Sequence, residues 1–128
     1  MCPCGSGLAD DACCARYHRG EPAPTAEALM RSRYTAYVRG EIDYLVETHD
    51  PATRSGLDRA SIATWSRATE WLGLEIVAKE YGTATDARGV VEFIARGKTK
   101  GAPFAQRERS RFRKIDGRWV YVDGKVRT

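Results

Sequence analysis

Apolar residues recur at intervals of three and four between residues 25 and 39, which is the period of one face of an α-helix. Thr25 has the side chain that an N-cap requires, and Gly40 suits the left-handed residue that ends a helix. The pattern therefore predicts a helix over residues 25–39, with Arg31 and Arg33 directed away from most of its apolar face. The apolar positions are Ala26, Leu29, Met30, Tyr34, Tyr37 and Val38.

Shorter patterns predict further elements along the chain. Two more helices are expected, the first through residues 42–46 and the second over residues 59–68 with Asp58 or Ser61 as its cap. From residue 72 the apolar period falls to two, which is typical of strands. The expected strands cover residues 72–79, 90–95, 107–115 and 118–122, and the last two flank a hairpin turn at Asp116-Gly117.

Helices followed by a run of antiparallel strands predict an α+β fold. We expect a twisted sheet of three to four strands, with about three helices packed on it and the 25–39 helix across its concave face. Between the amino-terminal segment and this helix, two prolines and Gly20 predict an irregular linker over residues 16–24.

All four cysteines of the chain lie within its first fourteen residues. Cys2 and Cys4 are separated by one residue, eight residues follow, and Cys13 and Cys14 are adjacent. Four thiolates gathered this closely suit one tetrahedral metal ion, and zinc prefers such ligands. A closed set of four thiolates leaves no coordination position for a substrate, so we expect one structural zinc per chain.

Other interpretations of these thiols stay open. An even number of cysteines is also compatible with disulfides or redox chemistry, and His18 lies close enough in sequence to compete as a ligand. We expect reduced thiols, because no apolar run of signal-peptide length occurs near Met1. Gly5 and Gly7 allow the loop to turn back on itself, and Ser6 is placed to hydrogen-bond a ligand sulfur.

The segment Cys2-Pro3-Cys4-Gly5-Ser6-Gly7, with Cys13-Cys14 downstream, resembles the SEC-C motif. That motif is a small zinc module best known at the carboxyl end of the bacterial translocase SecA. Residues 24–38, 71–76 and 108–112 with 116–119 resemble the YchJ family of uncharacterised bacterial proteins.

This resemblance implies two parts. Residues 1–20 would form a SEC-C zinc knuckle, and residues 21–128 a cone-shaped α+β domain of the nuclear-transport-factor-two-like, or cystatin-like, kind. It also implies a location in the bacterial cytoplasm. The family has no settled function, so the resemblance predicts a fold and a metal but no activity.

Charge is distributed unevenly along the chain. The 128 residues carry a net charge of +4, but residues 96–128 contain eleven Lys and Arg against three Asp and Glu. The preceding residues have a net charge of −4, so the carboxyl-terminal part suits an acidic or phosphate-bearing partner. No apolar stretch reaches the roughly 20 residues that span a membrane, so no membrane segment is expected.

An alternating row of arginines lies in the strand expected over residues 107–115. Side chains alternate between the two faces of a strand, and Phe112 indicates that the other face turns inward. The row is either a solvated sheet face or a docking surface for an acidic protein, the ribosome or RNA. A solvated row is the commoner case, but charge of one sign leaves the mutual repulsion uncompensated, which adds support for docking. The row consists of Arg107, Arg109, Arg111 and Arg113.

The inward face is the second candidate site, because cones of this kind often hold a pocket between sheet and helix. Its aromatic and polar side chains form either a packed core or the lining of a ligand cavity. Glu108 would act there as a base or pair with Arg31 or Arg33. No nucleophile elbow, phosphate loop or dinucleotide motif occurs in the sequence, so no catalytic residue is assigned. The candidates are Tyr34, Tyr37, His49, Trp65, Glu108, Ser110, Phe112, Trp119 and Tyr121.

Two classes of function follow from these features. The first is a zinc-containing cytoplasmic adaptor for a protein in secretion or chaperone pathways or for the ribosome, with RNA as a further partner of the basic face. The second is a small-molecule binder or enzyme that uses the cone. A cavity of at least roughly 300 Å³ with Glu108 facing it would favour the second class, and a cone filled by Trp65 and Trp119 would exclude it.

Overall fold

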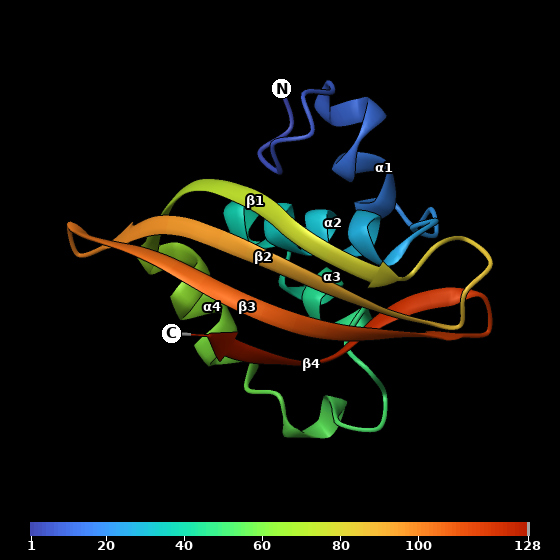
Figure 1. Ribbon diagram of the computed structural model, residues 1–128. Helices are drawn as coiled ribbons and strands as arrows, with labels where there is room; N and C mark the ends of the chain where they lie inside the picture. Colours follow the sequence, from blue (N-terminus) through green and yellow to red (C-terminus); the bar gives the residue numbers. More distant parts are fainter. Residues whose placement is uncertain (128) are drawn as a thin grey trace.

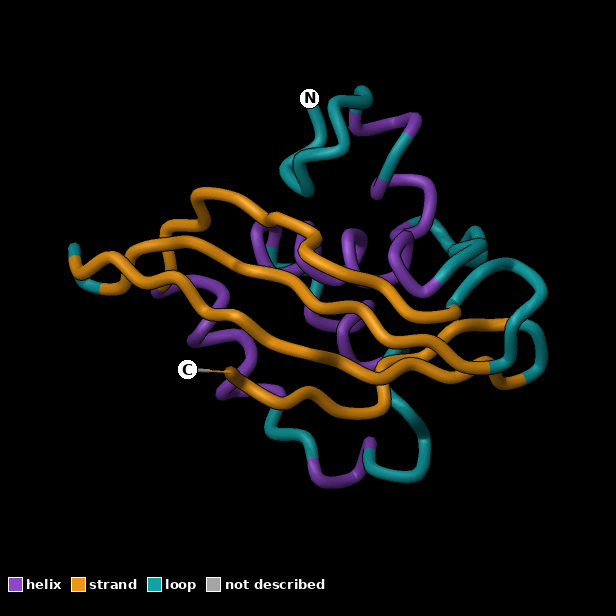
Figure 2. The backbone as a smooth tube through the Cα atoms, in the orientation of Figure 1, coloured by secondary structure: helices purple, strands orange, loops and turns teal. Residues whose placement is uncertain are grey.

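A four-stranded antiparallel sheet forms one layer of the molecule, and helices form the layer behind it (Figure 1). The computed structural model describes residues 1–127, with side chains described up to residue 126. The sheet order is β1-β2-β3-β4, and the backbone trace in Figure 2 shows the strands running side by side along their length. The strands are β1 (Thr69–Tyr81), β2 (Arg88–Thr99), β3 (Ala102–Ile115) and β4 (Arg118–Arg127).

The helices cover the concave face of the sheet. The longest is α2 (Ala26–Arg39), and α3 (Ile42–Glu47) and α4 (Arg59–Ala68) complete this layer. The amino-terminal segment sits above α2 in Figure 1 and contains the 3-10 turn η1 (Asp10–Ala12) and helix α1 (Cys14–His18). A second 3-10 turn, η2 (Arg54–Gly56), lies between α3 and α4. This arrangement confirms the expected α+β fold. None of the helices within residues 1–127 is long and apolar enough to cross a membrane.

The boundaries of α2 follow from its capping residues. The Thr25 side chain accepts a hydrogen bond from Ala28 N at 3.0 Å, and Gly40 adopts a left-handed φ of 71° directly after the helix. The predicted range of 25–39 is therefore confirmed to within one residue. Asp58, one of the two caps expected for α4, accepts from two backbone N–H groups of that helix.

The strands are longer than the alternation predicts. β1 begins at Thr69 rather than at residue 72, and β3 begins at Ala102 rather than at residue 107. A tight turn at Lys100-Gly101, with φ values of 52° and 79°, joins β2 directly to β3, so Pro103 belongs to a strand. Within the described chain, β4 pairs with β3 only from residue 107 onward, and a proline is tolerated where one side of a strand is unpaired. The predicted Asp116-Gly117 hairpin is confirmed, with φ values of 50° and 79°.

The segment after the cysteines is helical where the sequence predicts an irregular linker. α1 continues to His18, so the prediction is wrong for residues 16–18. Proline restricts its own position and the residue before it, and Pro22 lies beyond the end of α1. The chain becomes irregular only from Gly20 onward.

α2 is buried on nearly all of its surface. Its apolar residues form the centre of the hydrophobic core together with side chains from the concave face of β2 and β3. Its other side carries Ser32, Thr35 and Ala36, which are also fully buried because α1, α3 and the cysteine loop cover them. Arg33 is only 6% exposed, so the expectation that it points away from the core is wrong.

Gly82 and Gly89 pass too close to the start of α2 to carry side chains. A Cβ on Gly89 would lie 2.5 Å from Gly82 Cα and 3.1 Å from Ala26 Cβ. The backbone cannot easily shift, because Ala26 N donates to the Gly82 carbonyl at 3.0 Å. We expect Gly89→Ala to lower the free energy of unfolding by about 1–3 kcal/mol, measured by urea denaturation. Gly56→Ala is the matched control, since its Cβ would meet no atom within 4 Å. Equal stability of the two variants would contradict the close approach.

Candidate metal centre and internal cavity

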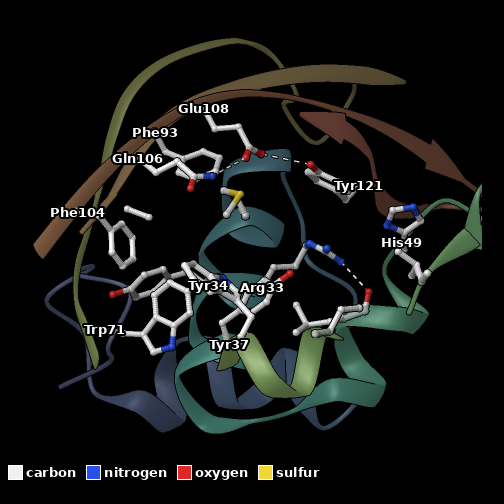
Figure 3. Close-up of a pocket in the computed structure, with 16 residues that line it drawn as sticks. Arg33, Tyr34, Tyr37, His49, Trp71, Phe93, Phe104, Gln106, Glu108 and Tyr121 are labelled. Carbon is white, nitrogen blue, oxygen red and sulfur yellow. Dashed lines mark hydrogen bonds between the residues drawn. The ribbon is translucent and has the colours of Figure 1, made fainter. Parts of the chain in front are cut away.

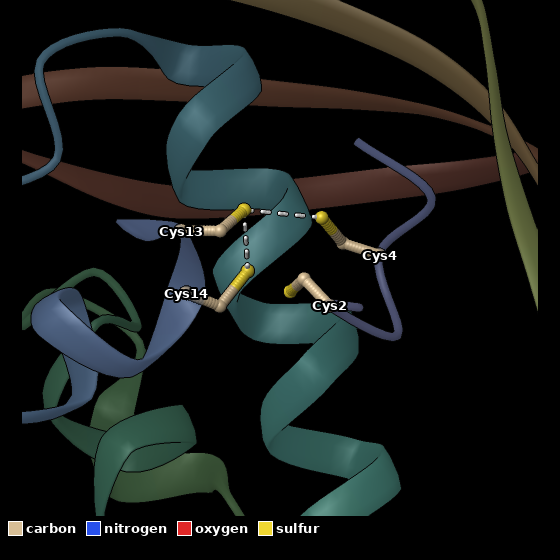
Figure 4. Close-up of side chains that lie close together, drawn as sticks. All are labelled: Cys2, Cys4, Cys13 and Cys14. Carbon is tan, nitrogen blue, oxygen red and sulfur yellow. Dashed lines mark hydrogen bonds between the residues drawn. The ribbon is translucent and has the colours of Figure 1, made fainter. Parts of the chain in front are cut away.

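The four cysteines lie in one buried cluster beside α2 (Figure 4). Their four Sγ atoms all lie within 4.8 Å of one another. Cys13 Sγ lies 3.5 Å from Cys4 Sγ and 3.8 Å from Cys14 Sγ. A tetrahedral zinc with Zn–S bonds of about 2.3 Å separates its sulfurs by about 3.8 Å, so these positions fit one ion held by four thiolates.

The amino-terminal loop turns back on itself to bring the two cysteine pairs together. Cys2 N donates to the Leu8 carbonyl at 2.9 Å and closes the loop. Gly5 and Gly7 make the reversal with left-handed φ values of 81° and 83°, which only glycine adopts without strain. The turn η1 and the first residue of α1 then present the second cysteine pair to the first.

Two hydroxyl groups contact the sulfurs. Ser6 Oγ lies 3.1 Å from Cys13 Sγ and accepts from Leu8 N at 3.2 Å. Thr35 Oγ1, on α2, lies 3.6 Å from Cys2 Sγ. Hydrogen bonds to a metal-bound sulfur orient it and stabilise its negative charge. Ser6 thus lies where the sequence predicts support for a ligand, whereas the contribution of Thr35 requires the tertiary structure.

His18 lies outside the cluster and contacts α2 instead. Its Nε2 donates to the Ser32 carbonyl at 2.7 Å, and its ring centroid lies 4.5 Å from that of Tyr44. Among the described residues, only the four cysteines form a group with metal-ligand spacing. His18 therefore packs α1 onto α2.

Further contacts fasten the amino-terminal knuckle, residues 1–20, to α2. Arg31 Nη1 donates to the Cys4 carbonyl at 2.7 Å, and Arg39 forms an ion pair with Asp10. Arg31 also pairs with Glu27, one turn earlier on the helix, at 2.9 Å. Because of these contacts, ordering of the cysteine loop also orders the outer side of α2.

The thiols of the cluster influence one another's protonation. The hydrogen bond from Cys14 lowers the pKa of Cys4 to about 4. The same contact raises the pKa of Cys14, and burial raises the pKa of Cys13. These contacts favour a thiolate at Cys4 beside protonated Cys13 and Cys14, and a cation would stabilise the loss of the protons from Cys13 and Cys14.

Acid should release the metal for this reason. Protons compete with the ion for Cys13 and Cys14, whose pKa values are raised, so metal affinity should fall as the pH decreases.

We expect Cys4→Ser to lose the metal at neutral pH and to unfold at a lower temperature, because the cover of α2 loosens. Elemental mass spectrometry and thermal unfolding followed by circular dichroism measure the two effects. Ser6→Ala keeps all four thiolates and should retain its metal. Stoichiometric metal in Cys4→Ser would exclude the four-thiolate site.

A cavity of about 230 Å³ lies beneath the sheet, bounded by α2, α3 and α4 (Figure 3). Trp71 and Phe104 form an aromatic end together with Trp65, whose ring packs against both, whereas Arg33 and Glu108 belong to a polar end. Six of the nine side chains predicted from the sequence surround it, namely Tyr34, Tyr37, His49, Trp65, Glu108 and Tyr121.

The other three candidates, Ser110, Phe112 and Trp119, do not line this cavity. Ser110 is fully buried and donates to Glu108 Oε2 at 2.6 Å. Phe112 packs edge-on against Tyr121, with 5.7 Å between ring centroids. Trp119 donates from Nε1 to a backbone carbonyl just before α2, at 3.4 Å. Phe112 and Trp119 thus belong to the packed core near the hairpin, and Trp65 and Trp119 do not fill the cone.

Three lining residues, Trp71, Phe104 and Gln106, lie where β1 and β3 begin earlier than the alternation predicts. Phe104 and Gln106 precede Glu108 at two-residue spacing on β3, so they share its inward face. Trp71 occupies the early part of β1 in the same way, and Phe93 lies opposite Glu108 on β2. The alternation at positions 104, 106 and 108 is the signal that would have found two of them.

Arg33 lines the cavity from α2. Its Nη1 donates to the Leu45 carbonyl at 2.9 Å and to Thr48 Oγ1 at 2.6 Å, and the guanidinium lies 4.7 Å above the Tyr121 ring. In the described chain no carboxylate lies at ion-pair distance, and Nε and Nη2 donate no hydrogen bond to protein. The expected pair with Glu108 is therefore not formed. Burial lowers the pKa of Arg33.

Glu108 lies on the opposite wall of the cavity (Figure 3). Its carboxylate accepts hydrogen bonds from Gln106 Nε2 at 3.3 Å, Ser110 Oγ at 2.6 Å and Tyr121 Oη at 3.3 Å. Burial raises the pKa of Tyr121, so its phenol keeps the proton that it donates. Gly124 makes room for this carboxylate, because a Cβ there would overlap Oε2. Glu108 is thus held in place by neighbours on its own sheet.

His49 reaches the polar end of the cavity from the segment after α3. This segment pairs with β4, since Tyr121 N donates to the Thr48 carbonyl and Asp50 N to the Tyr121 carbonyl, both at 2.8 Å. His49 Nε2 lies 2.9 Å from Thr53 Oγ1. Burial lowers the pKa of His49, so the imidazole is neutral at pH 7.

Every arginine of the β3 row pairs with an acidic side chain. The carboxylates come from β1, β2, β4 and the segment after α3, and Glu92 of β2 is buried between two of the arginines. The expectation of uncompensated repulsion is therefore wrong, because sheet pairing brings acidic residues from distant parts of the chain to the row. The pairs are Arg107–Glu92, Arg109–Glu92, Arg109–Glu80, Arg111–Asp123 and Arg113–Asp50.

The pair of Arg113 and Asp50 should make stability depend on pH. Asp50 is 4% exposed, and Arg113 donates to both of its oxygens at 2.7 Å, which holds the pKa of Asp50 below its usual value. A carboxylate with a depressed pKa stabilises the fold above its unfolded pKa of about 3.9 and loses that contribution as the pH falls through the folded value.

We expect Asp50→Asn to lower the melting temperature at pH 7, with a difference from the wild type that shrinks below about pH 4. Differential scanning calorimetry between pH 7 and pH 3 measures this. Asp43→Asn is the control, since Asp43 pairs with Arg59 at the exposed surface and should have little effect. A difference that stays constant over this pH range would show that the ion pair is not its cause.

Comparison with known proteins covers both the sheet and the knuckle. Residues 25–124 match the family model of the middle NTF2-like domain of YchJ. A SEC-C motif containing protein from Rhodopseudomonas palustris, with a solution structure, is 40% identical and has a TM-score of 0.90, covering 99% of this chain and 98% of its own. The crystal structure of a SEC-C motif containing protein from Psychrobacter arcticus is 34% identical with a TM-score of 0.85, covering 100% of this chain and 83% of its own.

Proposed function

This chain belongs to the YchJ family, and we propose that it is a zinc-containing protein that binds a small molecule in the cavity beneath its sheet. The cysteine cluster carries the metal, and the cavity between the sheet and α2 carries the ligand. The two sites share α2, which contacts the cluster through Thr35 and lines the cavity through Arg33, Tyr34 and Tyr37.

Zinc is the ion that we propose for the cluster. Thiolates are soft ligands, and a tetrahedral set of four sulfurs is typical of zinc or iron. All four sulfurs are buried, and a site closed by four protein ligands stabilises a fold rather than activates a substrate. The ion would neutralise the thiolate charge and hold the knuckle against α2.

The single observation that carries the ligand proposal is the polarity of the cavity walls. Burial of polar and charged groups is costly, so a space that serves only packing is expected to be apolar. Here Arg33 and Glu108 face the same space from opposite walls, and aromatic side chains line the remainder. An apolar cavity with a few convergent polar groups is typical of a ligand site. The volume of about 230 Å³ is below the expected 300 Å³ and restricts the ligand to a small molecule.

A macromolecular partner, whether a protein, the ribosome or RNA, stays a prediction of the sequence. The ion pairs of the arginine row reduce its support, because docking of an acidic partner would have to replace the carboxylates of Glu92, Glu80, Asp123 and Asp50. Ligand binding requires no such exchange. We therefore rank the cavity above the basic face.

Ligand-observed nuclear magnetic resonance with a library of small aromatic and amphipathic compounds tests the proposal. Ala95 lines the cavity from β2, so Ala95→Phe should fill the space and abolish binding of the compounds that the wild type binds. Ala105→Phe adds the same side chain at an exposed position of β3 and should leave binding unchanged. Compounds that still bind to a folded Ala95→Phe protein would show that the cavity is not the site. Amide spectra of both variants confirm that they are folded.

A further inference from the structure

We infer that the cavity selects small aromatic monocarboxylates, with Arg33 as the residue that binds the carboxylate. This inference rests on the proposed ligand-binding function and specifies the chemistry of its ligand. Arg33 is the positive charge of the cavity, and among the described residues it has no carboxylate at ion-pair distance and keeps N–H groups that donate to no protein acceptor.

Arg33 offers what a carboxylate requires. Its side chain is buried and contacts only neutral groups. It donates hydrogen bonds to the Leu45 carbonyl and Thr48 Oγ1, and it lies over the Tyr121 ring. Its Nε and Nη2 groups have no hydrogen-bond acceptor within the described residues. A guanidinium presents adjacent N–H groups in a planar fork that matches the two oxygens of a carboxylate. A buried charge without a partner is costly, so an anion that pairs with it gains more than it would in water.

The other polar groups of the cavity limit the ligand to one negative charge. His49 is neutral at pH 7, so Arg33 is the cation among the described lining residues. Glu108 already accepts three hydrogen bonds on the opposite wall and would repel a second negative group. A dianion such as a phosphate monoester would leave one charge uncompensated, whereas a monocarboxylate matches the single guanidinium.

The aromatic end of the cavity fits a ring. Trp65, Trp71 and Phe104 pack against one another there, with centroid separations of 5.6 to 6.4 Å in tilted and edge-on arrangements, and together they present an aromatic wall to the cavity. Trp65 is 38% exposed, so this end reaches the surface and gives a ligand a way in. A cavity of about 150 Å³ holds benzene, so one of about 230 Å³ holds a phenyl ring with a short acidic side chain, about ten non-hydrogen atoms. Phenylacetate has this size and charge.

Isothermal titration calorimetry with phenylacetate and its neutral analogue phenylacetamide tests the inference. We expect the wild type to bind the acid more tightly than the amide by at least about tenfold, because only the acid pairs with the buried guanidinium. Arg33→Met should remove this preference by weakening the acid and leaving the amide largely unchanged. Arg67→Met, which removes an exposed arginine of α4 outside the cavity, is the charge-matched control and should retain the preference.

A second variant keeps the test decisive if Arg33→Met fails to fold. Glu108→Gln removes the negative charge that faces the ligand and should raise the affinity for phenylacetate severalfold without a comparable change for phenylacetamide. An unchanged affinity for the acid in a folded Glu108→Gln protein would overturn the electrostatic assignment.

The outcomes separate this inference from the proposed function. Equal affinities for acid and amide, both abolished by Ala95→Phe, would overturn the selectivity for an anion and leave the cavity as a ligand site. Tighter binding of phenethylamine, an aromatic cation, than of phenylacetate would likewise overturn the selectivity for an anion and leave the cavity as a ligand site. If none of these compounds binds and the compound library also gives no hit that Ala95→Phe abolishes, both the inference and the proposed function are wrong.

Discussion

Helix α2 is buried from two opposite sides, and both the sheet and the cysteine knuckle are held together by packing against it. The concave face of the sheet covers one side with apolar and aromatic contacts. The other side is covered by the cysteine knuckle and α3, over small and hydroxylated residues such as Ser32 and Thr35. The knuckle by itself is too small to bury a core, and its four buried cysteines lie close enough together for metal–thiolate bonds to make such a segment rigid.

The same helix connects the metal cluster with the cavity. One side of α2 carries Thr35 toward the cysteine loop, and the neighbouring Arg33, Tyr34 and Tyr37 reach the cavity walls. The position of Arg33 is further fixed by the Leu45 carbonyl at the end of α3. A change that loosens the knuckle would therefore be transmitted to the cavity through the position of a single helix, without direct contact between the cysteine cluster and the cavity.

Charge on the outer face of the sheet is balanced in space although it is unbalanced along the chain. Residues 96–128 carry a strong positive excess, and the remainder is negative. Antiparallel pairing places acidic residues of β1, β2 and β4 beside the arginines of β3. Glu92 and Asp50 are buried by these contacts, so the row contributes to the packing of the sheet and to the attachment of the segment after α3. A basic stretch of sequence is thus no measure of a free basic surface.

Features formed by residues close together in the chain could be predicted from the sequence. Thr25 and Gly40 bound α2, Asp116-Gly117 turns the last hairpin, and the spacing of four cysteines indicates a metal, because caps, turns and ligand loops are formed by neighbours a few residues apart. Three features required the packed structure: Arg33 is buried at the cavity, each β3 arginine has an acidic partner, and Ser110 and Trp119 lie outside the cavity. The physical reason is that a helical period predicts one buried face, whereas α2 is covered on two, and the groups that cover it and pair across the sheet come from distant segments.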